Sequence, residues 1–293
     1  MDSANFRVSG LRCVIGGNEA AGEHLPGYNG VHALFGPRQR RSAFVPEYAG
    51  LNLEHYFDGF HGRADREAYF EPRRSPMEFH LLTESTALLY QPPTPFWGVE
   101  SWTTFTVREP FYVDMVYRCV PRKRAFENGC LGAFWASYIN HPESKAIHLR
   151  GRRTAKEKTR WLSHESPRHG EQSSVRHLGD RVRLPLRPAI ERFMYASMAP
   201  LRYDRPYYFG LRRGYMILLL FECRHVLRFS HSPSGGGQGN PAWDFYMLVP
   251  DYRIGEECRL RVRLCYRPFV STRDVATECA AWKRSLIGEP KCD

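Results

Sequence analysis

Lysine is scarce in this chain of 293 residues, although the chain is strongly basic. Only six of its 42 basic residues are lysines, so 36 are arginines, and with 31 acidic residues the formal net charge is +11. The arginines are spread along the whole chain in short clusters. We therefore expect most of this charge to lie on the surface, and we do not expect a nucleic-acid partner.

Long apolar runs and paired cysteines are also missing. The longest apolar run, Tyr215 to Phe221, is too short to cross a bilayer, and the first residues do not have the pattern of a secretory signal. None of the eight cysteines forms a CxxC pair, which argues against a zinc site or a thioredoxin-like motif. We expect a cytoplasmic protein with reduced thiols, no membrane partner and no metal.

Motifs for nucleophilic catalysis and nucleotide binding are absent as well. There is no GxSxG elbow. The glycine run Gly235 to Gly237 lacks the GK[ST] signature and the helix of a P-loop, and an apolar strand pattern follows it. We therefore expect no cofactor.

What is present is a chain full of short strand patterns. Val99 to Val107 and Tyr112 to Val120 alternate in polarity on either side of a turn, and Glu78 to Tyr90 has the pattern of a second hairpin. Arg259, Arg261 and Arg263 alternate with apolar residues, which predicts a strand with one solvent-exposed face.

Together these patterns predict an all-β fold, a large antiparallel β-sandwich forming a single domain over residues 1–293. Residues 151–188 contain few apolar side chains and predict a long irregular segment or flap, and residues 272–287 predict a C-terminal helix.

Three polar constellations lie at predicted strand ends. In the first, strand alternation would put Asn52 and Glu54 on one face and His55 on the other. In the second, an aromatic strand that includes Trp135 and Tyr138 leads into Asn140, His141 and Glu143, and His148 lies on the next strand. The third surrounds the glycine run and consists of His231, Gln238, Asn240, Trp243 and Asp244.

Imidazole, carboxylate and amide groups in such sets can transfer protons or bind sugar hydroxyls, and indole or phenol rings can stack on a sugar. His141 or His55 would act as the acid or base, with Glu54 or Glu143 as its partner. Asn52, Trp135, Tyr138, Asn140, His148 and the third constellation would bind the ligand, and Arg73 would favour an anionic sugar. This interpretation requires the three constellations to converge on one concave face.

Several segments also carry a resemblance to a known group. VPEYAGLNLEHYFDG, LYQPPTPFWGVES, FWASYINHPESKAIHLRG and SPSGGGQGNPAWDF resemble a family of uncharacterised bacterial proteins, which is similar to the galactose mutarotase-like supersandwich superfamily. The resemblance covers about residues 28–270, and it implies a supersandwich fold with its core in this range. It also implies acid/base chemistry by a histidine and a glutamate on a sugar.

Three functions therefore remain open. The first is a carbohydrate-active protein that binds a small sugar or an oligosaccharide on a concave sheet face, with epimerase-, mutarotase- or lyase-like chemistry if it is an enzyme. The second is a non-catalytic carbohydrate-binding module. The third is a polyanion-binding protein, which would need one continuous stripe of arginine. The sequence leaves the sugar, the reaction and the oligomeric state open.

Overall fold

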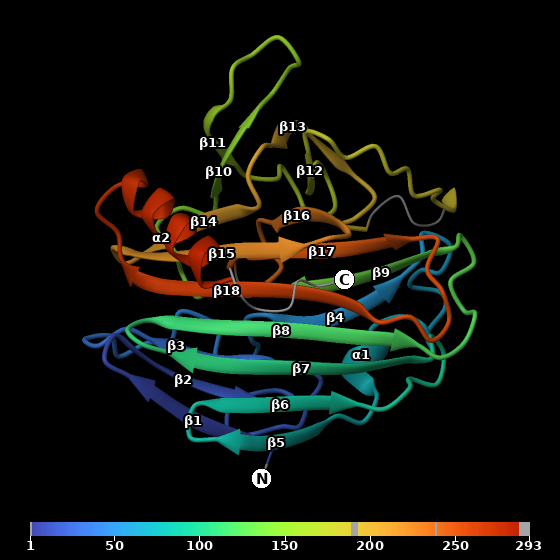
Figure 1. Ribbon diagram of the computed structural model, residues 1–293, viewed down its shortest axis with the longest axis horizontal. Helices are drawn as coiled ribbons and strands as arrows, with labels where there is room; N and C mark the ends of the chain where they lie inside the picture. The colour runs from blue at the N-terminus through green and yellow to red at the C-terminus, as the bar shows by residue number, and fades with distance from the viewer. Residues whose placement is uncertain (1, 189–192, 238, 287–293) are drawn as a thin grey trace.

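The structure is a computed structural model that describes residues 2–188, 193–237 and 239–286. Two β-sheets make up most of it (Figure 1). The smaller sheet contains β1 (Ser3–Val8), β2 (Leu11–Gly16) and β3 (Gly30–Phe35) in chain order.

The larger sheet has fifteen strands. They are β4 (Asn52–Phe57), β5 (Glu78–Thr83), β6 (Thr86–Gln91), β7 (Val99–Arg108), β8 (Tyr112–Pro121), β9 (Cys130–Ala136), β10 (Ile147–Arg152), β11 (Arg160–His164), β12 (Ser174–His177), β13 (Met198–Tyr203), β14 (Tyr207–Arg212), β15 (Tyr215–Cys223), β16 (Val226–Ser232), β17 (Ala242–Pro250) and β18 (Cys258–Pro268). Two helices accompany them, α1 (Glu71–Arg74) and α2 (Thr272–Ser285).

The order of strands in the larger sheet brings distant parts of the chain together. It runs β4-β9-β17-β16-β12-β13-β10-β14-β15-β18-β8-β7-β6-β5, with β11 paired to β10. Within the described residues the strands pair antiparallel, except for β12 and β13, which are parallel. Strands β4, β9 and β17 are neighbours at one end of this order. Segments that begin at residues 52, 130 and 242 therefore lie side by side.

The predicted all-β fold is confirmed. The hairpin patterns correspond to β7 with β8 and to β5 with β6. Burial alternates along β7, because one of its faces packs on the core and the other is half-exposed. The predicted C-terminal helix is α2, which begins with a capping box in which Ser271 and Asp274 each accept a backbone N–H. Its last predicted residue, Ile287, lies outside the described residues.

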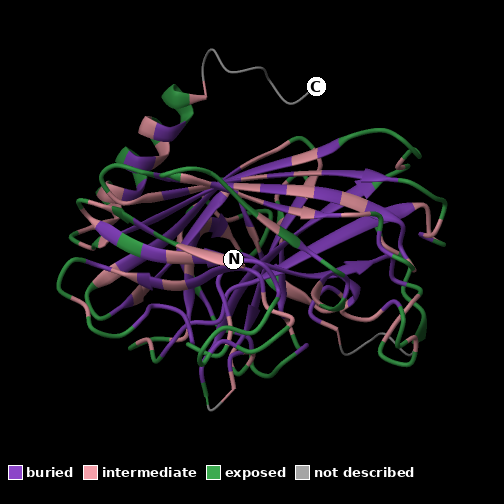
Figure 2. Ribbon diagram, turned by 90° about the horizontal axis from the view of Figure 1, so that it is seen from below, coloured by how far each residue is buried: buried purple, intermediate pink, exposed green. Residues whose placement is uncertain are grey.

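The main hydrophobic core lies on one face of β4, β9 and β17 and contains Trp97, Trp135 and Trp243, all fully buried. A second apolar cluster, with Phe134, Tyr138 and Tyr246, covers their other face. These strands are therefore buried on both sides, and Figure 2 shows exposed residues gathered mainly in the loops and along α2. Strands buried on both faces carry few charged residues, so the charged residues on these strands are candidates for a functional role.

One prediction about exposure was wrong. The arginine face of β18 is not solvent-exposed, since Arg261 and Arg263 are buried and Arg263 forms two hydrogen bonds of 2.6 and 2.7 Å with Asp114. Helix α2 also packs beside this strand, where Arg267 pairs with Glu278 at 2.7 Å. Residues 151–188 contain the short strands β11 and β12, which hydrogen-bond to β10 and β16, and irregular stretches before and after them.

The seven cysteines within the described residues all keep free thiols, and most of them are buried. No helix in this part of the chain is long and apolar enough to cross a membrane.

Candidate functional site

A cavity of about 730 Å³ lies on the outer face of β4, β9 and β17, opposite the tryptophan core. We call it the central cavity. Its acidic, basic and histidine lining residues come from separate segments of the chain: Glu54 and His55, Arg63, Arg73, His169 and Asp244. The topology therefore brings ionisable groups from distant segments together in this cavity.

A β-bulge in β4 creates the central feature of this cavity. Leu53 pairs with Trp135 and His55 pairs with the next residue, Phe134, so Glu54 is the extra residue. Partners directly opposite each other share a sheet face. Leu53 therefore faces the core with Trp135, while His55 faces the cavity with Phe134. The prediction that Glu54 and His55 lie on opposite faces was wrong, because a bulge shifts the alternation by one residue.

Glu54 is the hub of the contacts in the central cavity. Its side chain is 10% exposed, and one carboxylate oxygen lies 3.3 Å from Nη1 of Arg73. The hydroxyl of Tyr138 donates a hydrogen bond to the same oxygen. The other oxygen lies 3.6 Å from Nε2 of His55. A carboxyl group, an imidazole, a guanidinium and a phenol are thus held against one another.

Arg73 is fixed by more than its ion pair. It lies at the end of α1, donates from Nε to the carbonyl of Gly27 at 2.9 Å, and stacks its guanidinium 3.8 Å from the centroid of the Tyr28 ring. The ring of Phe70 lies on another side at 4.7 Å. These contacts leave the arginine little freedom, so it is a pre-positioned positive charge beside Glu54.

Burial shifts the pKa values of the carboxyl groups and of the imidazole in opposite directions. It raises the pKa of Glu54, although Arg73 and the hydrogen bond from Tyr138 oppose the shift. It lowers the pKa of His55 well below its usual value, helped by the nearby positive charges of Arg73 and Arg63. Burial also raises the pKa of Asp244 well above its usual value, and the charge of Glu54 adds to this. Burial in this cavity therefore disfavours the charged forms of all three groups.

Strand alternation separates the residues of the other two constellations. On β17, Asp244 lines the cavity and accepts a hydrogen bond from the backbone N–H of Ser137 at 3.0 Å, while Trp243 points into the core. On β9 and the residues after it, Tyr138 lines the cavity and Trp135 is in the core. Neither tryptophan has an exposed ring face, so the expected stacking roles of Trp135 and Trp243 were wrong.

Sequence patterns did not predict several of the residues that line the central cavity. Rings surround His55, with Phe70 stacked at 4.2 Å and Tyr69 at 5.1 Å between centroids, and Phe193 further away at 6.5 Å. His169 lines the cavity as well, and its Nδ1 lies 2.9 Å from the hydroxyl of Ser232. These residues come from irregular segments, so periodicity could not have placed them.

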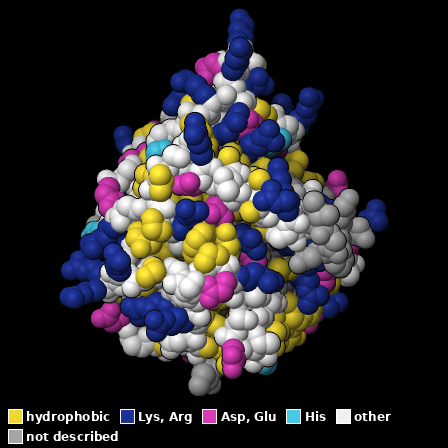
Figure 3. All heavy atoms as spheres, turned by 60° about the vertical axis from the view of Figure 1, so that its left-hand side comes forward, with side chains coloured by type: hydrophobic (Ala, Val, Ile, Leu, Met, Phe, Trp, Pro, Cys, Tyr) yellow, Lys and Arg dark blue, Asp and Glu magenta, His cyan; other side chains and the backbone are white. Residues whose placement is uncertain are grey.

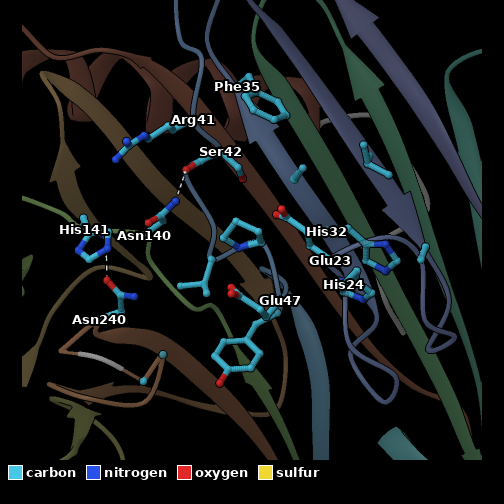
Figure 4. Close-up of a pocket in the computed structure, with 18 of the residues that line it drawn as sticks. Glu23, His24, His32, Phe35, Arg41, Ser42, Glu47, Asn140, His141 and Asn240 are labelled. Atoms are coloured by element: carbon cyan, nitrogen blue, oxygen red, sulfur yellow. Dashed lines mark hydrogen bonds between the residues drawn. The ribbon is translucent and has the colours of Figure 1, made fainter.

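A second cavity of about 720 Å³ receives three of the other predicted residues. We call it the outer cavity. Asn140, His141 and Asn240 line it, and the backbone N–H of His141 donates to Asn240 Oδ1 at 2.9 Å (Figure 4). The predicted convergence is therefore partial, because strand ends from the second and third constellations lead into two cavities.

The remaining predicted residues lie in neither cavity. Asn52 is buried and accepts a hydrogen bond from the backbone of Asn29 at 3.0 Å, so its role is structural. Glu143 is exposed and accepts a hydrogen bond from the backbone N–H of Arg213. It is therefore not the catalytic partner of His141 that the sequence predicted. His148 stacks on Phe209 at 5.0 Å.

His231 is fully buried and bonded to backbone groups on both sides, which removes it from the predicted ligand-binding set. Gln238, another predicted ligand-binding residue, lies outside the described residues.

Basic side chains do not form one continuous stripe on the face shown in Figure 3, where acidic and hydrophobic side chains separate them. Several inward arginines are paired, such as Arg228, whose Nε lies 2.6 Å from Asp180. The polyanion-binding alternative therefore gains no support from this face.

No protein-family model and no curated protein sequence matches this chain. Solved structures do. An alpha-N-acetylgalactosaminidase, NagBb from Bifidobacterium bifidum, matches with a TM-score of 0.51 and 11% identity, over 97% of this chain and 39% of that chain. A GalM/aldose epimerase homologue from C. elegans matches with a TM-score of 0.50 and 8% identity, over 92% of this chain and 100% of that one.

A galactose mutarotase-like protein from Lactobacillus casei ATCC 334 also matches, with a TM-score of 0.46 and 10% identity, over 90% of this chain and 100% of that chain. At these identities the likeness concerns the fold. The chain has the galactose mutarotase-like sandwich fold, as its resemblance implied.

Proposed function

We propose that this protein is a carbohydrate-active enzyme that binds a sugar in the central cavity and transfers protons with Glu54 and His55. The observation that carries the proposal is the bulge in β4, which aims two adjacent, buried groups with opposite pKa shifts into one cavity. A bulge next to an active site is a recurrent way of re-aiming a side chain.

The spacing of the two groups suits chemistry at the anomeric centre of an aldose. The anomeric hydroxyl and the ring oxygen are bonded to the same carbon, so one proton acceptor and one donor next to each other can serve both. Glu54 and His55 lie 3.6 Å apart at their nearest atoms. His55 is favoured in the neutral form that accepts a proton, and Glu54 in the form that donates one.

The step would open the sugar ring. His55 takes the proton of the anomeric hydroxyl, the bond between the anomeric carbon and the ring oxygen breaks, and Glu54 gives its proton to that oxygen. The product is the open-chain aldehyde, and the reverse step on its other face gives the other anomer. Arg73 and Tyr138 stabilise the carboxylate that Glu54 becomes, since both already contact it.

A non-catalytic sugar-binding protein is the second candidate. The rings of Tyr69, Phe70, Phe134 and Phe193 line the central cavity and would suit a sugar face without any reaction. This alternative uses the same cavity, so only turnover separates it from the enzyme.

Polarimetry of D-galactose and D-glucose mutarotation tests the proposal. We expect Glu54→Gln and His55→Gln to lower the catalysed rate by about 100-fold or more, which is the usual contribution of a general acid or base. Glu143→Gln and His80→Gln are matched controls, because both residues are exposed or half-exposed and outside the cavity, and they should keep the wild-type rate.

Three results would count against the proposal in different ways. Full activity in Glu54→Gln would remove this residue from catalysis. Sugar binding by calorimetry without turnover would favour the binding protein. Binding to heparin that weakens steeply with salt, in the absence of sugar binding, would favour the polyanion alternative.

A further inference from the structure

The outer cavity lies between the small sheet and three loops of the large one. Its lining includes His32 of β3 and residues of the segments 40–48, 140–141 and 236–240. In Figure 4, Asn140, His141 and Asn240 lie on one side, Glu23, His24 and His32 on the other, and Glu47 between them. At about 720 Å³ it has the size of a ligand pocket in its own right.

The two cavities are neighbours, because the same segments form the walls of both. Tyr138 lines the central cavity, and Asn140, two residues later, lines the outer one. In the glycine loop, Gly235 lines the central cavity and Gly236 the outer one. The two cavities therefore share these two stretches of chain in their walls.

Three tyrosine rings form a further shared wall. Tyr48 lines the outer cavity, whereas Tyr28 and Tyr138 line the central one. The Tyr48 centroid lies 4.7 Å from that of Tyr28 and 4.9 Å from that of Tyr138. Tyr138 also contacts Glu54, so this wall reaches from the proposed acid to the outer cavity.

The outer cavity contains buried polar groups that packing alone does not explain. The rings of His24 and His32 are stacked with centroids 3.5 Å apart, and each residue is only 5% exposed. Each Nε2 lies at hydrogen-bond distance from a backbone carbonyl, 2.8 Å for His24 and 3.1 Å for His32. Nδ1 of His24 has no hydrogen-bond partner among the described residues. A buried polar atom without a partner is costly, so His24 is held in place at an energetic cost in the wall of this cavity.

The charges around the outer cavity balance. Two exposed arginines, Arg40 and Arg41, and two exposed glutamates, Glu23 and Glu47, line it. Burial lowers the pKa of His24 and His32, to about 3 for His32. Carboxylates, guanidinium groups and the amides of Asn140 and Asn240 supply both acceptors and donors. This balance suits a neutral polyhydroxylated ligand better than an ion.

We infer that the outer cavity is a second sugar subsite, and that the ligand of this protein is an oligosaccharide with one neutral unit in the outer cavity and the next in the central cavity. The inference rests on the proposed function, since it assumes that the central cavity binds a sugar. The unit in the outer cavity contributes affinity, and the acid and base act on the unit beside Glu54.

Calorimetric titration with paired sugars tests the inference, using D-galactose with lactose and D-glucose with maltose. For at least one pair, we expect the wild-type protein to bind the disaccharide at least tenfold more tightly than the monosaccharide. A double variant, Glu23→Gln with Glu47→Gln, should reduce the disaccharide affinity to that of the monosaccharide and leave monosaccharide binding unchanged. Glu84→Gln is a matched control on the β5–β6 turn and should change neither.

The outcomes separate this inference from the proposed function. Equal affinity for both members of every pair, or equal weakening of both by the double variant, would overturn the second subsite and leave the central cavity in place. No binding of any of the four sugars would overturn the proposed function and the inference together. If Glu54→Gln weakens the binding of both sugars and the double variant weakens only the binding of the disaccharide, the proposed function and the inference are both supported.

Discussion

His231 illustrates how a polar residue in a promising motif can be purely structural, and its role can be tested by pH. The residue is fully buried on β16. Its Nδ1 accepts a hydrogen bond from the backbone N–H of Ser166 at 3.0 Å, so this atom carries no proton. Its Nε2 donates to the carbonyl of Lys145 at 2.8 Å. The neutral imidazole therefore joins two loops, and a second proton would break the bond from Ser166.

The magnitude follows from the pKa. Burial lowers the pKa of His231 to about 4, and the nearby His164 adds to this. In the unfolded chain the group titrates near pH 6.5. Between these values the unfolded state holds one more proton than the folded state, so the free energy of unfolding falls as the pH falls through this window. At about 1.4 kcal/mol per unit, His231 alone accounts for roughly 2 kcal/mol of this loss between pH 7 and pH 5.

Urea unfolding of the wild type and of His231→Leu, followed by far-UV circular dichroism at both pH values, measures this contribution. At pH 7 the variant should be about 1–3 kcal/mol less stable, because the Ser166 N–H loses its acceptor. The Lys145 carbonyl keeps its bond from Trp243 Nε1 at 2.7 Å. On going to pH 5, the wild type should lose about 2 kcal/mol more than the variant.

The comparison contains its own control. His32, whose pKa is lowered to about 3, destabilises both proteins in acid, and its contribution cancels in the difference. Identical losses in the wild type and in His231→Leu would refute the assignment of His231 as a buried neutral group.

Two further substitutions test packing around the sheet. Asp180→Asn should lower the free energy of unfolding in urea by about 3–5 kcal/mol. The side chains of Arg228 and Asp180 are each 2% exposed and pair at 2.6 Å, so the variant leaves a buried charge without its partner. A loss under about 1 kcal/mol would contradict a buried ion pair. Gly210→Ala would put a Cβ 2.1 Å from the Trp243 ring. We therefore expect the free energy of unfolding to fall by about 1–3 kcal/mol or more, with a lower melting temperature. An unchanged melting temperature would show that the ring moves freely.

Local patterns determined most of the secondary structure. The alternation of Val99 to Val107 and of its partner strand depends on one face packing against the core, and that signal is present in the residues themselves. The end of the chain likewise contains its own capping residues, Ser271 and Asp274. Hairpins and helix caps are formed by neighbours in the chain, so the sequence contains the information that they need.

The candidate site required contacts between distant segments. The sequence places Glu54 and His55 next to each other, but only pairing with β9 shows the bulge that turns both into the central cavity. Trp135 and Tyr138 are three residues apart, and the tertiary structure decides that the first packs in the core and the second faces Glu54.

The sequence by itself therefore determined an all-β chain and many of the polar residues that now line cavities. The tertiary structure decided which of these residues meet, because strand order brings β4, β9 and β17 together from three distant parts of the chain. It also decided the directions in which the pKa values of Glu54 and His55 shift, because these shifts arise from burial, and burial is a property of the fold.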